Sequence, residues 1–138
     1  MLVSIVDYSD SFFEQDKDTA SYHVGGAVHR GKFVLLTHEQ EEVCVFSPIQ
    51  LSEFHANIVE RYVSQKGVEG HYNSRQDKYF LHDESWRVLG GGHWEYNTSE
   101  SKVTLFGKSL AYGGLMLEPL VNDLMKFEAF DGANIFCA

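Results

Sequence analysis

The sequence has little of several features that would place it in a special class of protein. Only two of its 138 residues are proline and 43% are hydrophobic, which argues against a disordered chain. No segment approaches the roughly 20 consecutive apolar residues that a membrane-spanning helix needs, and the N-terminus carries no basic leader. We therefore expect one cytoplasmic domain covering residues 1–138.

Cysteine is equally scarce. The two cysteines, Cys44 and Cys137, lie far apart between apolar neighbours and lack the C-x-x-C spacing of a metal site. One possible bridge does not make the disulfide framework of a small secreted domain. We expect both to be buried structural thiols.

Basic residues are the third shortage. The chain has 11 lysines and arginines against 20 aspartates and glutamates, a formal net charge of −9. Such a surface repels nucleic acids and anionic membranes, so we expect neither as a partner. A phosphate could bind only in a local pocket of basic side chains or backbone amides.

Several catalytic motifs are also absent. Six residues after Cys44 stands Gln50 rather than arginine, so the thiolate loop of the tyrosine phosphatases is missing. Asp7 and Asp10 lack the D-x-D spacing of aspartyl-phosphate enzymes, and the chain has no R-H-G, G-x-S-x-G or G-x-x-x-x-G-K-[ST] motif. Its seven histidines lack the spacing of zinc sites. We expect neither a metal nor a cofactor.

Runs of β-branched and aromatic residues alternate with turn-forming segments, which predicts an α+β fold. We expect a single domain in which a mixed sheet of about six strands carries two main helices. The predicted strands cover residues 2–6, 32–37, 42–46, 86–96, 102–107 and 134–137, and the helices cover about 48–66 and 115–129. Residues 7–20 are expected to be irregular and 21–28 to be a short extended piece. Residues 67–85 have no firm assignment, with a short strand at 78–81 as a candidate.

The first helix has the clearest start signal. Ser47 as N-cap, Pro48 at the first helical position and Gln50 as capping-box partner predict that it begins at about residue 48. Gly67 ends it. Apolar residues then follow the helical period: Leu51, Phe54, Ile58, Val59, Tyr62 and Val63.

His55 lies along this apolar stripe, between Leu51 and Ile58 on the same helix face. Periodicity alone favours a buried histidine that bonds to the backbone. The functional interpretation is a general base or a nucleophile, because an imidazole on a rigid helix can work near neutral pH.

Two glycine-rich segments follow. Residues 90–92 are three glycines inside a predicted strand, which indicates either a bulge or a close approach that clears space beside a pocket. Residues 107–114 connect a strand to the second helix and are either a simple turn or an anion-binding concavity of backbone amides. Ser109 would add a hydroxyl there.

Three motifs together resemble the Janus/Ocnus family, whose best-known members are the small protein phosphohistidine phosphatases. They are E-F-H-A-N-I at residues 53–58, L-G-G-G at 89–92 and G-K-S-L-A-Y-G at 107–113, in the same order as in the family. The similarity covers roughly residues 31–114. Each motif alone is weak, but the three in register are fairly specific.

The resemblance implies a monomeric, metal-independent enzyme that removes phosphate from phosphohistidine and from other phosphoramidates such as phospholysine. Its substrate would be a phosphohistidine-containing protein or a small phosphoramidate. The family's catalytic histidine falls on His55, as base or nucleophile, and its strand lysine falls on Lys32. Phosphate-binding positions fall on Ser109 and Ala111, with the backbone of Leu110 between them.

The chain departs from the family at several positions. His93 and Ser47 stand where the family has arginines, Lys108 stands where it more often has an aromatic residue, and residues 67–85 are longer. Arginine suits phosphate because it is always charged and bidentate, whereas His93 binds phosphate as a cation only when protonated. Two alternatives remain: a non-catalytic phosphate-binding or anion-binding protein that recognises a phosphorylated partner, and a different enzyme on the same scaffold.

Overall fold

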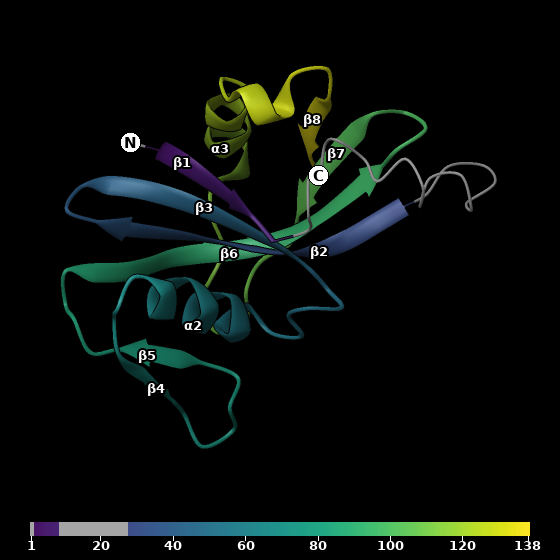
Figure 1. Cartoon of the computed structure of the whole chain (residues 1–138). Coiled ribbons are helices and arrows are strands. Elements are labelled where there is room, and N and C mark those ends of the chain that lie inside the picture. Colours follow the sequence, from purple (N-terminus) through teal and green to yellow (C-terminus); the bar gives the residue numbers. More distant parts are fainter. Residues whose placement is uncertain (1, 9–27) are drawn as a thin grey trace.

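The computed structural model describes residues 2–8 and 28–138, and in this part of the chain a six-stranded mixed sheet forms the centre (Figure 1). Its strand order is β1-β3-β2-β6-β7-β8. The β1–β3 and β7–β8 pairs are parallel and the other three are antiparallel. The strands are β1 (Leu2–Asp7), β2 (Val28–His38), β3 (Glu41–Pro48), β6 (Trp86–Asn97), β7 (Lys102–Phe106) and β8 (Asn134–Cys137).

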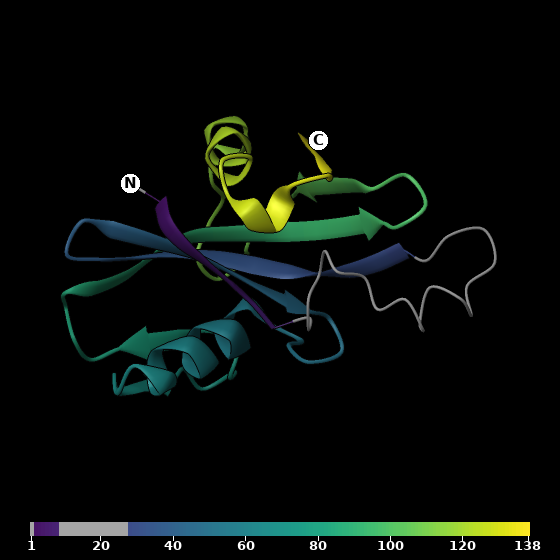
Figure 2. The ribbon, with the colours of Figure 1, turned by 45° about the horizontal axis from the view of Figure 1, so that its top comes forward.

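Each face of the sheet carries one helix. Helix α2 (His55–Gln65) covers one face and α3 (Leu117–Leu124) covers the other (Figure 2). Side chains alternate along β2, so Phe33 and Leu35 join the core under α3 while Val34 and Leu36 join the core under α2. A strand buried on both faces needs such a continuous apolar run. The predicted α+β class, with a mixed sheet and two helices, is confirmed.

The predicted start of the first helix is wrong. Ser47 pairs with Lys32 in the sheet, and its carbonyl oxygen accepts a hydrogen bond from the Trp94 indole (3.2 Å), so β3 continues through Pro48. The helix begins at His55, where the Asn57 side chain accepts a hydrogen bond from the backbone N–H of Phe54 (2.8 Å). The competing sheet interactions of Ser47 therefore outweigh its local capping signal.

This later start changes the apolar stripe and places His55 in the first turn. Leu51 and Phe54, predicted to pack inside, are 44% and 41% exposed. Ile58 and Val59 are buried as expected. The positive end of the helix dipole consequently lies at His55.

The second helix is shorter than predicted. It ends at Leu124, and a 3₁₀ turn at Glu128–Phe130 follows. The chain leaves the helix so that Phe130 packs 6.0 Å from the ring of Phe46 in the core. Cys44 is buried, but Cys137 near the end of β8 is exposed, so the prediction of two buried thiols is wrong for Cys137.

Residues 67–85 contain a hairpin, of which the sequence offered only the second strand as a candidate, at residues 78–81. Strands β4 (Gly70–Tyr72) and β5 (Tyr79–Leu81) form a separate two-stranded sheet on the same side as α2 (Figure 1). Each strand has only three residues, too few for a clear period. The predictions for residues 7–20 and 21–28 lie almost entirely outside the described residues. In the described ranges, no helix is both long and apolar enough to span a membrane.

Candidate functional site

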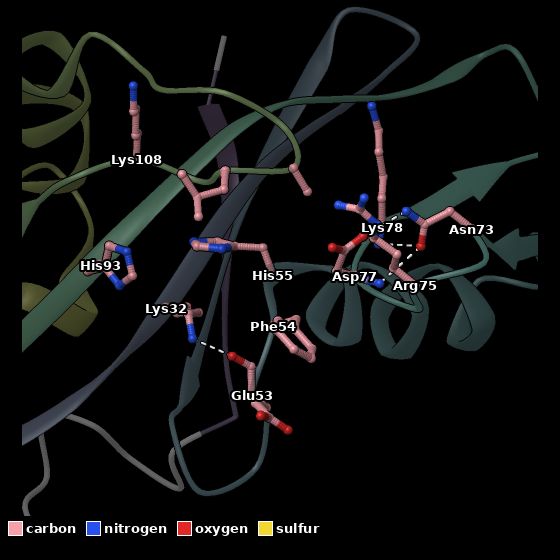
Figure 3. Close-up of a pocket in the computed structure, with 12 residues that line it drawn as sticks. Lys32, Glu53, Phe54, His55, Asn73, Arg75, Asp77, Lys78, His93 and Lys108 are labelled. Atoms are coloured by element: carbon pink, nitrogen blue, oxygen red, sulfur yellow. Dashed lines mark hydrogen bonds between the residues drawn. The ribbon is translucent and has the colours of Figure 1, made fainter.

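A cavity of about 700 Å³ lies beside the first turn of α2 (Figure 3). Its wall comes from β2, the start of α2, the β4–β5 hairpin, β6 and the loop after β7. The lining residues are Lys32, Glu53, Phe54, His55, Asn73, Arg75, Asp77, Lys78, His93, Lys108, Leu110 and Ala111. The cavity therefore brings together five of the six predicted site residues, all except Ser109.

The pairing of β2 with β6 builds the base of the cavity. Lys32 lies opposite His93 in the register, and both line the cavity. Gly91 is two residues before His93 and so faces the same side. A Cβ atom at Gly91 would lie 2.5 Å from the carbonyl oxygen of Phe33 and 2.8 Å from Cδ2 of His55. The glycine is therefore required by the close approach of the His55 ring.

His55 is held in one tautomer. Its Nε2 lies 2.8 Å from the carbonyl oxygen of Gly92, which can only accept, so Nε2 carries the proton and donates. The lone pair is then on Nδ1, which has no hydrogen-bond partner among the described residues and is not sealed from solvent. Nδ1 is thus the ring nitrogen available to a ligand.

The surroundings of His55 keep it neutral. Burial lowers the pKa of His55 to about 4, with smaller contributions in the same direction from His93 and Lys32. The hydrogen bond to Gly92 opposes this shift. At neutral pH the ring therefore offers an unprotonated nitrogen.

Lys32 and His93 provide the basic groups beside His55. Lys32 Nζ donates a hydrogen bond to the carbonyl oxygen of Glu53, and its pKa is lowered by burial, against the opposing effect of the Glu53 charge. The pKa of His93 is lowered by burial and by Lys32, while hydrogen bonding with the Lys108 backbone opposes the shift. The rings of His93 and His55 lie 5.3 Å apart. Without a bound anion, His93 is mostly neutral at pH 7.

The loop after β7 is a closed turn in which Ser109 has a structural role. Its N–H donates to the carbonyl oxygen of Gly91 (3.1 Å), and its Oγ accepts from the N–H of Tyr112 (3.0 Å). Ser109 is 1% exposed and does not line the cavity. The N–H groups of Leu110 and Ala111 have no acceptor in the described ranges. These two amides are therefore the backbone donors that this loop could offer to an anion.

The structure adds residues that sequence reasoning missed. Arg75 and Lys78 reach the cavity from the turn of the β4–β5 hairpin. Lys108, which the sequence had already singled out, also lines it. The unusual length of residues 67–85 was the only signal for the first two. Ser47, in contrast, is fully buried and bonds to Ser52 Oγ (2.7 Å), so nothing at position 47 replaces an arginine.

The charge of the cavity is opposite to that of the chain. Four cationic side chains line it, against two carboxylates; the cations are Lys32, Arg75, Lys78 and Lys108, and the carboxylates are Glu53 and Asp77. The whole chain has a net charge of −9. Such a local reversal attracts an anionic ligand to this cavity rather than to the surface around it.

The comparisons with known proteins add no relative. No family model matches the chain, and none of the curated proteins matches it. The resemblance to the Janus/Ocnus family therefore stays a prediction that depends on the three motifs.

Proposed function

We propose that the protein is a metal-independent phosphoramidate phosphatase that hydrolyses the P–N bond of phosphohistidine. The observation that supports this most directly is the neutral His55 ring, whose Nδ1 is available beside a cationic cavity. The three motifs that resemble the Janus/Ocnus family support the same activity.

The lining residues suit a phosphoryl group. Its oxygens would accept hydrogen bonds from the N–H groups of Leu110 and Ala111 and from Lys32 Nζ, which now bonds to Glu53. Backbone amides and a lysine stabilise the charge that develops on a transferring phosphoryl group. Ser109 contributes by holding the loop in shape.

His55 Nδ1 would use its lone pair in one of two ways. It removes a proton from a water molecule that attacks phosphorus, or it attacks phosphorus itself and is later freed by water. In both cases the P–N bond breaks and its electron pair goes to the leaving nitrogen. That nitrogen takes a proton from the protonated Nδ1 in the first route and from solvent water in the second. Both routes need the neutral ring that burial produces.

His93 would become protonated when the substrate binds. A phosphoryl dianion beside an imidazole raises the pKa of that imidazole, because an opposite charge favours the protonated form. The ring of His93 stacks on Phe106 (5.5 Å between ring centroids), which holds it in place. His93 would thus supply in the complex the positive charge that arginine supplies in the family.

The deciding experiment is a turnover assay with EDTA present. The substrates are phosphoramidate, a phosphohistidine peptide and a phosphomonoester. We expect hydrolysis of the first two and a loss of about 10³-fold in kcat/KM for His55→Ala, as expected when a positioned acid–base or nucleophilic group is removed. His38→Ala, outside the cavity, is the matched control and should retain activity.

A full rate in His55→Ala would remove His55 from the mechanism. Phosphate binding by calorimetry without turnover would favour the second candidate, a non-catalytic protein that binds a phosphorylated partner. That candidate is favoured by one specific observation: Ser47 and His93 leave the cavity without the two arginines of the family.

A further inference from the structure

We propose that the β4–β5 hairpin forms a second anion-binding subsite in this cavity. The substrate would therefore carry a carboxylate or phosphate group in addition to its phosphoryl group. This inference deepens the proposed function and rests on it for the role of the phosphoryl subsite around His55.

Two basic side chains of the hairpin line the cavity without a carboxylate partner, although Lys78 Nζ lies over the rings of Phe80 (5.2 Å) and Tyr112 (5.8 Å). Arg75 and Lys78 lie on the other side of His55 from Lys32 and His93 (Figure 3). Within residues 2–8 and 28–138, neither side chain forms an ion pair or a hydrogen bond. An anion on this side of the cavity would meet two cations that no protein carboxylate has neutralised. A guanidinium also binds carboxylate and phosphate in a bidentate manner.

The turn between β4 and β5 is ordered by Asn73. Its Oδ1 accepts hydrogen bonds from the N–H groups of Asp77 (3.0 Å) and Lys78 (3.1 Å). Its Nδ2 donates to Asp77 Oδ1 (2.7 Å), so the carboxylate of Asp77 already has a hydrogen-bond partner within the turn. The arrangement holds Asp77 on Asn73 and leaves Arg75 available.

Two tyrosines fix the hairpin to the segments that would bind the phosphoryl group. Tyr112, in the loop after β7, donates to the carbonyl oxygen of Tyr79 (2.8 Å) and accepts from its N–H (2.8 Å). Tyr72 of β4 donates to Glu60 Oε1 on α2 (2.7 Å) and accepts from Asn57 Nδ2 (3.3 Å). The hairpin is consequently positioned against both the loop and the helix.

The size of the cavity agrees with a substrate of two anionic groups. About 700 Å³ falls within the usual range of small-molecule pockets, on the order of 300–1,000 Å³, and exceeds what a phosphoryl group alone needs. The phosphoryl subsite uses the Lys32 side of that space. The Arg75 side remains for the rest of the substrate.

Binding of matched phosphonates tests the second subsite without any turnover. Alkylphosphonates are compared by calorimetry with ω-carboxyalkylphosphonates of the same chain length, over a short series of lengths. In the wild type we expect the carboxylate to tighten binding about tenfold at the best length, the scale of one charged hydrogen bond. Arg75→Gln/Lys78→Gln should reduce this gain to less than about twofold.

Lys102→Gln/Lys126→Gln is the matched control, because it removes the same charge outside the cavity. It should retain the gain. The proposal is overturned if the wild type gains nothing from the carboxylate at any length, or if the Arg75/Lys78 variant keeps the full gain. Because these ligands are not hydrolysed, a failure of the proposed phosphatase activity does not affect the result.

A kinetic comparison then identifies the source of the second anion. One pair is free phosphohistidine and its methyl ester; the other is a phosphohistidine peptide with a neighbouring glutamate and its glutamine counterpart. A preference for the free amino acid points to a small substrate, and a preference for the glutamate peptide points to an acidic side chain of a protein. In either case the preference should disappear in the Arg75/Lys78 variant, and no preference in either pair contradicts the inference.

Discussion

The two faces of the sheet use the same strands for different purposes. The face under α3 is an apolar core in which Phe33, Leu35 and Trp94 are buried together with the side chains of α3. The face under α2 has its own core, but it also buries His55 and places Lys32 at a cavity. One face supplies stability and the other combines stability with a site whose polar groups are partly desolvated. Because successive side chains of β2 point to opposite faces of the sheet, neighbouring residues of this strand lie in the two different environments.

Two adjacent glycines give the sharpest test of this division. Gly91→Ala would place a Cβ against the His55 ring, whereas Gly92→Ala would place one 2.8 Å from Cζ of Phe33 in the other core. We expect Gly91→Ala to lower kcat/KM by at least about 10²-fold, because a small displacement of a catalytic group has effects of that size. Gly92→Ala should instead lower the free energy of unfolding by about 1–3 kcal/mol, the usual cost of overpacking a core.

Urea unfolding and steady-state kinetics on both variants provide the measurements. If Gly92→Ala loses activity as severely as Gly91→Ala while remaining folded, the two faces are not separate in function. Gly114→Ala serves as a control near the cavity, since its Cβ would meet only Cβ of Lys108 at 3.2 Å.

The free energy of unfolding should fall at acid pH because of His55, which is buried on the α2 face. His55 has a pKa of about 4 in the folded protein and about 6.5 in the unfolded chain. As the pH falls, the unfolded chain binds the proton first, so the stability loss begins near pH 6.5 and is complete below about pH 4. We expect this loss to be on the order of 2 kcal/mol, after allowance for the partial exposure of the ring.

Urea unfolding of wild type and His55→Gln between pH 4 and pH 7 measures this loss of stability. The wild type should lose stability relative to the variant as the pH falls, and a constant difference would contradict the prediction. A substitution on the other face, such as Leu124→Ala, should change stability by the same amount at each pH, because Leu124 does not titrate.

The smallest expected effect concerns His93. Burial and Lys32 lower the pKa of His93 in the free protein, so its contribution to anion binding should decline as the pH rises. Sulfate is a suitable probe because it does not titrate in this range. His93→Arg should tighten sulfate binding about fivefold at pH 7.5, a gain on the scale of one charged hydrogen bond. Because arginine does not titrate in this range, sulfate binding by the variant should be nearly independent of pH between 5.5 and 8. A wild-type affinity that stays flat over this range would remove His93 as a charged ligand.

Much of the sheet could be predicted from sequence because its signals are local. The runs around Phe33, Val45 and Val103 have the composition of strands, and the turn between β2 and β3 was expected where Glu39 and Gln40 have positive φ. The start of α2 could not be predicted, because Ser47 is committed to the sheet by Trp94, a partner 47 residues away.

The site shows the same limit. His55 and Ala111 lie in the motifs, Lys32 was implied by the resemblance to the Janus/Ocnus family, and the structure places all three around one cavity. Arg75 and Lys78 carry no motif. They reach the cavity because Tyr112, 33 residues from Tyr79, holds the hairpin there. Residues 67–85 alone contain no sign of that contact.

The position of the hairpin in the chain has an evolutionary consequence. It leaves α2 after Gly67 and returns to β6 at Trp86, and among the residues that the structure describes its two strands pair only with each other. Its length and composition can therefore change without shifting the register of any strand in the central sheet. Residues 67–85 therefore form a module in which insertions, deletions and substitutions would change one wall of the cavity while Lys32 and His93 keep their register in the central sheet.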